Sequence, residues 1–193
     1  MKVWLFAAAS LSLAACASAS KPGAMVAQLT DATIIREDSS IRSAFTVGTV
    51  TGGKETSPLW KSNVSSDDFA EALRQSLAGH ALLASSDGKY VVDAELVQVK
   101  QPVLGGFNMT VTSTVKYKVT EAATSTVVLD EEVVNEYTAK MGDAFVGVER
   151  LRLANEGSMK GNIGQFIEAL VTKMDAAAVP MIDSAVEEAA PQS

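Results

Sequence analysis

The chain has 193 residues, of which 47% are hydrophobic and 20% are charged, and its formal net charge at pH 7 is −7. This length and this apolar content predict one domain with a hydrophobic core of its own. The excess of acidic residues argues against binding to nucleic acid or to anionic lipid headgroups, because both need clustered lysine and arginine.

The residues before position 16 have the layout of a secretory signal. Lys2 supplies the positive charge, residues 3–13 are apolar apart from Ser10 and Ser12, and two alanines follow. The apolar run is shorter than the about 20 residues that a membrane-spanning helix needs. No later stretch reaches that length, so we predict no transmembrane helix.

The signal ends at the only cysteine of the chain, in the tetrapeptide Leu13-Ala14-Ala15-Cys16. This tetrapeptide resembles the lipobox of bacterial lipoproteins. The resemblance implies that the signal peptidase recognises Leu13, Ala14 and Ala15, that the thiol of Cys16 takes a diacylglyceryl group, and that leader 1–15 is removed. The new amine would be acylated too, because two or three acyl chains such as palmitate anchor a protein where one does not.

By the same resemblance, Ala17 after the cysteine favours the outer membrane, with the domain facing the periplasm. Loss of Lys2 with the leader leaves 15 basic and 23 acidic residues, a net charge of −8.

Two other interpretations of this segment stay open. Residues 17–19 also form an A-x-A cleavage site, which would remove Cys16 and release a soluble periplasmic protein beginning at Ser20. Alternatively, Cys16 is a small buried residue of a cytosolic helix.

The rest of the chain divides into three parts. Residues 16–24 are small and polar and are predicted to be a flexible tether between the lipid and the domain. Residues 25–179 are expected to form a single domain, and residues 180–193, which begin with a proline, are expected to be a loose tail.

The first regular elements are a strand and a helix. Residues 43–51 alternate apolar and polar side chains and end at a glycine pair, which is typical of a strand. The following helix is predicted to begin at Ser65 or Ser66, with Asp67 and Asp68 in its first turn. Its apolar stripe repeats every four residues, at Phe69, Leu73 and Leu77.

Three strands are predicted next, over residues 89–102, 108–122 and 125–139. The alternation is clearest in the middle strand, whose inward face is expected to carry Met109, Val111, Val115, Tyr117 and Val119. The inward face of the last strand is expected to carry Val127, Leu129, Val133 and Tyr137.

Residues 148–174 form the last predicted element, a long amphipathic helix. Gly157, Gly161 and Gly164 each disfavour a helix by about 1 kcal/mol relative to alanine, so we expect a kink or a close backbone contact there. The resulting order predicts an α+β fold. It is a two-layer sandwich in which two helices cover one face of a four-stranded mixed sheet.

A lipobox followed by the order β-α-β-β-β-α resembles the lipopolysaccharide-assembly lipoprotein family of the outer membrane. The closing sequence RLANEGSMKGNIGQFIEAL is similar to the "A…E…NI…L" ending of these small lipoproteins. The resemblance implies a non-enzymatic subunit that holds or plugs partner proteins of an envelope complex, for lipopolysaccharide or other polymer assembly and export.

The residues themselves favour no catalytic set, metal site or cofactor. His80 is the only histidine, and it is expected at the surface or at the boundary of the core, because a zinc site would need further ligands. Helix capping accounts for Asp67 and Asp68. The glycine pairs at 52–53 and 105–106 fit turns and no phosphate-binding loop.

Two apolar segments are better candidates for contact with a partner. Val103, Leu104 and Phe107 lie in a predicted hairpin tip, where side chains are normally polar. Such a tip contacts a partner or a lipid, or it is buried under another loop. Trp60 precedes the first helix and is either an interface anchor or a lid on the core.

Three hypotheses follow, and the oligomeric state is left open. The first is the outer-membrane subunit, which would seat on its complex through the sheet or the hairpin tip. The second is a lipid-binding module with an open cleft lined by Met159, Ile163 and Phe166. The third is a hydrolase built around His80.

Overall fold

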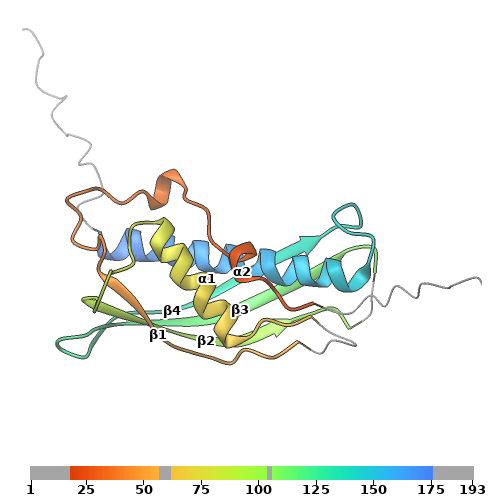
Figure 1. The fold of residues 1–193 in the computed structure, drawn as a ribbon, viewed down its shortest axis with the longest axis horizontal. Coiled ribbons are helices and arrows are strands. Elements are labelled where there is room, and N and C mark those ends of the chain that lie inside the picture. The colour runs from red at the N-terminus through yellow and green to blue at the C-terminus, as the bar shows by residue number, and fades with distance from the viewer. Residues whose placement is uncertain (1–17, 57–61, 104–105, 176–193) are drawn as a thin grey trace, which may run out of the picture.

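The computed structural model describes residues 18–56, 62–103 and 106–175 (Figure 1). Their elements are the short 3-10 helices η1 (Pro22–Ala24) and η2 (Asp31–Thr33), β1 (Phe45–Thr51), α1 (Ser66–Gly79), β2 (Tyr90–Lys100), β3 (Met109–Glu121), β4 (Thr126–Ala139) and α2 (Gly147–Met174). Among these described residues, every helix is too short or too polar to cross a bilayer.

The four strands form one sheet in the order β1-β2-β3-β4, with β1 parallel to β2 and the other pairs antiparallel. Both α1 and α2 lie on the same face of this sheet (Figure 1). Helix α2 packs on β3 and β4, and α1 packs on β1. The structure therefore confirms the predicted two-layer α+β sandwich with a mixed sheet, in which the crossover through α1 joins the parallel strands β1 and β2.

Helix α1 begins where its cap predicts. The side chain of Ser65 accepts a hydrogen bond from the backbone N–H of Asp68 at 3.1 Å, which satisfies one of the free donors of the first turn. The predicted stripe of Phe69, Leu73 and Leu77 is fully buried.

Helix α2 runs for 28 residues, and its glycines allow a close approach to β4. A Cβ at Gly157 would lie 2.4 Å from the ring of Tyr137, and one at Gly161 would lie 2.4 Å from the amide of Asn135. The expectation of close contact is confirmed at these two positions. It is wrong at Gly164, where the nearest atom to an added Cβ is 3.9 Å away.

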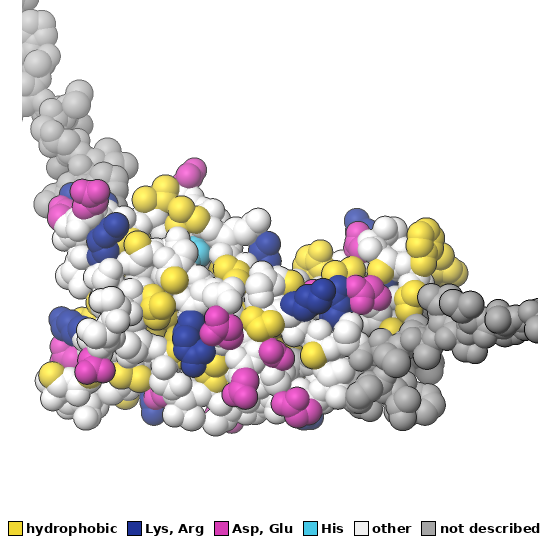
Figure 2. All heavy atoms as spheres, viewed as in Figure 1, with side chains coloured by type: hydrophobic (Ala, Val, Ile, Leu, Met, Phe, Trp, Pro, Cys, Tyr) yellow, Lys and Arg dark blue, Asp and Glu magenta, His cyan; other side chains and the backbone are white. Residues whose placement is uncertain are grey.

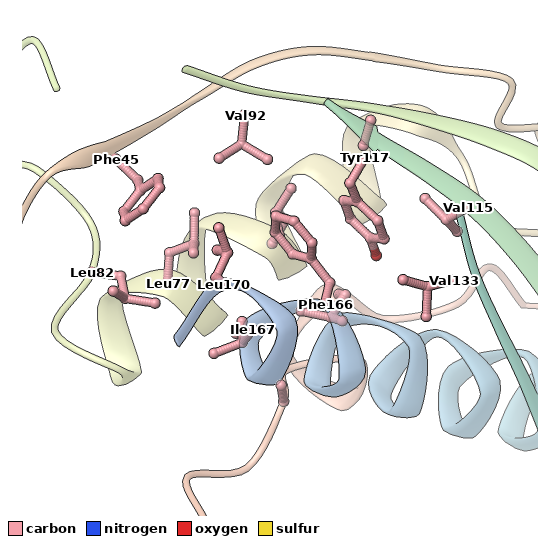
Figure 3. Packing of buried hydrophobic residues seen from close by; sticks show 14 of the residues in the cluster. Phe45, Leu77, Leu82, Val92, Val115, Tyr117, Val133, Phe166, Ile167 and Leu170 are labelled. Carbon is pink, nitrogen blue, oxygen red and sulfur yellow. The ribbon is translucent and has the colours of Figure 1, made fainter. Parts of the chain in front are cut away.

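The core lies between the sheet and the two helices (Figure 3). Tyr117 of β3 and Phe166 of α2 stack with ring centroids 3.9 Å apart. The predicted inward face of β3 is confirmed, because each of its five apolar residues is buried. Burial of the Tyr117 phenol raises its pKa well above its ordinary value.

One strand face departs from the prediction. Leu129 and Val133 of β4 are buried as expected, but Val127 is 50% exposed. The register shifts where Val119 pairs with Leu129 and Thr120 pairs with Val127, so Val128 is an extra residue in β4. An extra residue reverses the alternation of faces, which is why the prediction for Val127 is wrong.

Candidate interaction surface

Large apolar side chains are exposed on two loops at one end of the sheet. One loop precedes β3 and the other precedes α2. We call the exposed apolar residues of both loops the apolar tip. They are Val103, Phe107, Met141, Phe145 and Val146, which are 98%, 77%, 44%, 86% and 47% exposed. Figure 2 shows hydrophobic side chains gathered at the right-hand end of the molecule, around the loop between β4 and α2. Such a cluster marks a contact surface more often than scattered apolar residues do.

One buried side chain joins the two loops of the tip. Arg150, in the first turn of α2, is 8% exposed. Its Nη1 donates to the carbonyls of Ala144 and Phe145 at 2.7 and 2.8 Å, and its Nη2 donates to the carbonyl of Gly106 at 3.0 Å. The guanidinium therefore fixes the backbone beside Phe107 and Phe145, and both aromatic rings are presented by tethered loops.

A small separate core supports the tip from below. It consists of Met109, Val111, Ala139, Leu151 and Ala154, which come from β3, β4 and α2. The two loops therefore adjoin buried, packed residues. This packing limits how far the apolar side chains of the tip can turn into the protein interior.

The sequence located part of this surface. Val103 and Phe107 are exposed, and their role in partner contact stays a prediction. Leu104, Trp60, Cys16 and the signal residues 13–15 lie outside the described residues. The loop that carries Met141, Phe145 and Val146 was missed, although two adjacent apolar residues between a strand and a helix are a signal that could have found it.

The start of the described chain is attached near this end. Ser62 donates through Oγ to the carbonyl of Ser18 at 2.8 Å. The carbonyl of Ser62 in turn accepts from Gln101 Nε2 at 3.0 Å and from Asn155 Nδ2 at 2.9 Å.

The N-terminal segment makes a second contact with the domain a few residues after Ser18. The N–H of Lys21 donates to Glu156 Oε1 at 2.8 Å, and Met25 is fully buried. Glu156 also pairs with Arg152, which pairs with Glu149 and lowers the pKa of that carboxyl. The chain therefore lies on the domain from Ser18 onward.

His80 is not where the sequence predicted it. Its side chain is 2% exposed, and its Nδ1 lies 2.7 Å from the carbonyl of Ser76. The turn after α1 folds back on β1, where Phe45 donates to the carbonyl of Leu82. Because the residue is buried, the expectation of a surface or boundary position is wrong.

The cleft required by the lipid-binding hypothesis is closed. Met159, Ile163 and Phe166 are fully buried against the sheet. Polar groups between α2 and the sheet are occupied as well. Tyr117 donates to Asn162 Oδ1 at 2.8 Å, and Ser158 donates to Ser113 Oγ at 2.8 Å.

The other face of the sheet is left uncovered by the helices (Figure 1). It is polar, and a depression of about 410 Å³ on it is lined by Thr49, Thr51, Asp93, Ala94, Glu95, Lys116 and Lys118. Charges of both signs alternate there, and Lys116 pairs with Asp130 at 3.4 Å. Within the described ranges, three histidine, cysteine, aspartate or glutamate side chains nowhere gather closely enough to hold a metal ion.

Comparisons with known proteins find solved structures with a similar fold. No family model and no curated protein matches the sequence. The crystal structure of a candidate lipoprotein from Caulobacter crescentus CB15 is similar, with a TM-score of 0.51 and 12% identity over 69% of this chain and 91% of that one. A Xanthomonas campestris protein of the DUF330 family is similar with a TM-score of 0.56 and 8% identity, over 81% of this chain and 96% of that one. At these identities the likeness shows a shared fold.

Proposed function

We propose that this protein is a non-enzymatic lipoprotein of the bacterial outer membrane. Acyl chains on Cys16 anchor it, the domain faces the periplasm, and it serves as an accessory subunit of a complex that assembles or exports lipopolysaccharide or another envelope polymer. The observation that carries the proposal is the lipobox ending at Cys16, two residues before the chain attaches to the domain at Ser18.

Two further observations support it. The fold is that of a Caulobacter protein described as a candidate lipoprotein. Polar side chains between α2 and the sheet are engaged with each other, as Tyr117 is with Asn162. This arrangement suits a structural subunit.

The mass of the mature protein, extracted from membranes, tests the anchor. A chain that begins at Cys16 and carries acyl groups is expected, and Cys16→Ser should abolish both the acyl mass and processing before residue 16. A chain that begins at Ser20 without lipid would contradict the anchor and would favour the soluble periplasmic alternative.

A site-specific photocrosslinker tests the role as a subunit. Lys118 is exposed on the uncovered face of the sheet, and Gln75 is exposed on α1, on the opposite side. We expect a crosslinked envelope protein from position 118 and none from position 75. Deletion should also raise envelope permeability; the absence of both effects would contradict the role.

A further inference from the structure

We propose that the apolar tip docks into the same bilayer that holds the acyl chains of Cys16, so that the domain stands with this end on the membrane. The inference rests on the proposed lipidation. It adds a second membrane contact, made by Phe107, Phe145 and their apolar neighbours.

The length of chain between the anchor and the domain limits their separation. Cys16 and Ser18 are two residues apart, so their Cα atoms lie within about 7 Å of each other. The carbonyl of Ser18 is held by Ser62 at 2.8 Å. The bilayer must therefore come close to Ser62, because so short a link cannot act as a spacer.

The tip is at this end of the domain. Ser62 accepts a hydrogen bond from Gln101, and Val103 follows two residues later. Ser62 also accepts from Asn155, and Arg150, which holds both loops of the tip, lies about 7.5 Å before Asn155 along α2. Figure 1 shows the red start of the described chain and the loop between β4 and α2 toward the same right-hand end.

The chemistry of the tip fits the boundary between headgroups and acyl chains. Its two phenylalanines are 77% and 86% exposed, and aromatic and aliphatic side chains insert at that depth. Arg150 already holds their loops, so docking requires little further ordering of the backbone. The opposite end of the same sheet has the turn Ala122–Ser125, whose side chains are small or polar.

Charge does not supply the attraction. Lys140 lies beside Asp143, whose carboxylate accepts from the Lys140 N–H at 2.7 Å, and the guanidinium of Arg150 is buried. Docking therefore depends on apolar side chains and is expected on zwitterionic lipid as well as on anionic lipid.

A unique thiol makes the test direct. Cys16 is the only cysteine, so in the lipidated protein Met141→Cys carries the only free thiol and leaves both phenylalanines of the tip in place. This variant is labelled with an environment-sensitive fluorophore and reconstituted in phosphatidylcholine vesicles, with and without brominated acyl chains. Ala123→Cys, in the turn at the opposite end, is the control.

The label at 141 should shift to the blue and be quenched by brominated lipid, and the label at 123 should do neither. A water-like label at 141 on protein that sediments with the vesicles overturns the docking of the tip and leaves the anchor intact. Protein that does not sediment overturns both. Shielding at 141 in native membranes but not in pure lipid would assign the tip to a protein partner and overturn the proposal.

A second series measures the contribution of the rings. With the label on Met141→Cys, each of Phe107→Ser and Phe145→Ser should lower the ratio of docked to undocked protein roughly tenfold, since burial of a phenylalanine side chain contributes at least that factor. Val134→Ser, which removes an exposed apolar residue outside the tip, should leave the ratio unchanged. Equal effects from all three changes would overturn the assignment to the tip.

Discussion

Gly157 of α2 lies directly against the ring of Tyr137 on β4, and a Cβ at this glycine would be 2.4 to 2.6 Å from three ring atoms. Nothing larger than hydrogen fits without a shift of the ring or the helix. This contact explains why a helix contains a glycine in spite of its conformational cost.

Gly157→Ala is expected to destabilise the protein by about 1–3 kcal/mol, because it overpacks the contact with Tyr137. Gly164→Ala is the matched control on the same helix. Its new methyl group meets only Ala27 at 3.9 Å, so the gain in helix propensity should stabilise the protein by up to about 1 kcal/mol. Urea unfolding of both variants measures the difference. Equal effects would contradict the proposed contact.

Tyr117→Phe should lower the free energy of unfolding by about 1–2 kcal/mol at neutral pH. The change keeps the stack on Phe166 but leaves Oδ1 of Asn162 buried without its donor. Thermal unfolding measures the loss. An unchanged unfolding temperature in Tyr117→Phe would contradict a stabilising role of the hydrogen bond between Tyr117 and Asn162.

From the burial of the Tyr117 phenol we predict that the free energy of unfolding decreases at alkaline pH. Burial raises the pKa of Tyr117 in the folded protein above the value of about 10 in the unfolded chain. Its contribution is fully present below pH 10 and decreases as the pH rises from there, because only the unfolded state releases the proton readily. Unfolding followed from pH 8 to pH 11 should show a shallower decline in Tyr117→Phe than in the wild type.

Arg150→Met should loosen the apolar tip. The change removes three hydrogen bonds to the carbonyls of Gly106, Ala144 and Phe145 and leaves the apolar stem in place. Hydrogen exchange should increase over residues 106–108 and 140–147 and stay unchanged in the middle of α2. An unchanged exchange rate in both loops would show that Arg150 does not hold them.

Ser65→Ala should cost about 1 kcal/mol of stability, because the N–H of Asp68 loses its acceptor at the start of α1. Ser65→Thr should retain most of the stability, since threonine also caps helices and keeps the hydroxyl that donates to the Asp68 carboxylate at 2.7 Å. Chemical unfolding of the two variants separates loss of the cap from a general intolerance of change at this position.

The sequence by itself determined the elements, their order and most of their buried faces. These follow from local properties: the alternation along β3, the four-residue spacing of Phe69, Leu73 and Leu77, and the cap at Ser65. Each such signal lies within one segment and needs no knowledge of its neighbours. The resemblance of residues 13–16 to a lipobox is equally local.

The tertiary structure alone decided the features that depend on distant partners. It joined the loops of Phe107 and Phe145 through Arg150, buried His80 at the end of α1, and exposed Val127 through an extra residue in β4. Register and loop contacts arise from the pairing of backbone groups that are far apart in the chain. A pattern read along the sequence cannot specify them, because several pairings satisfy the same local alternation.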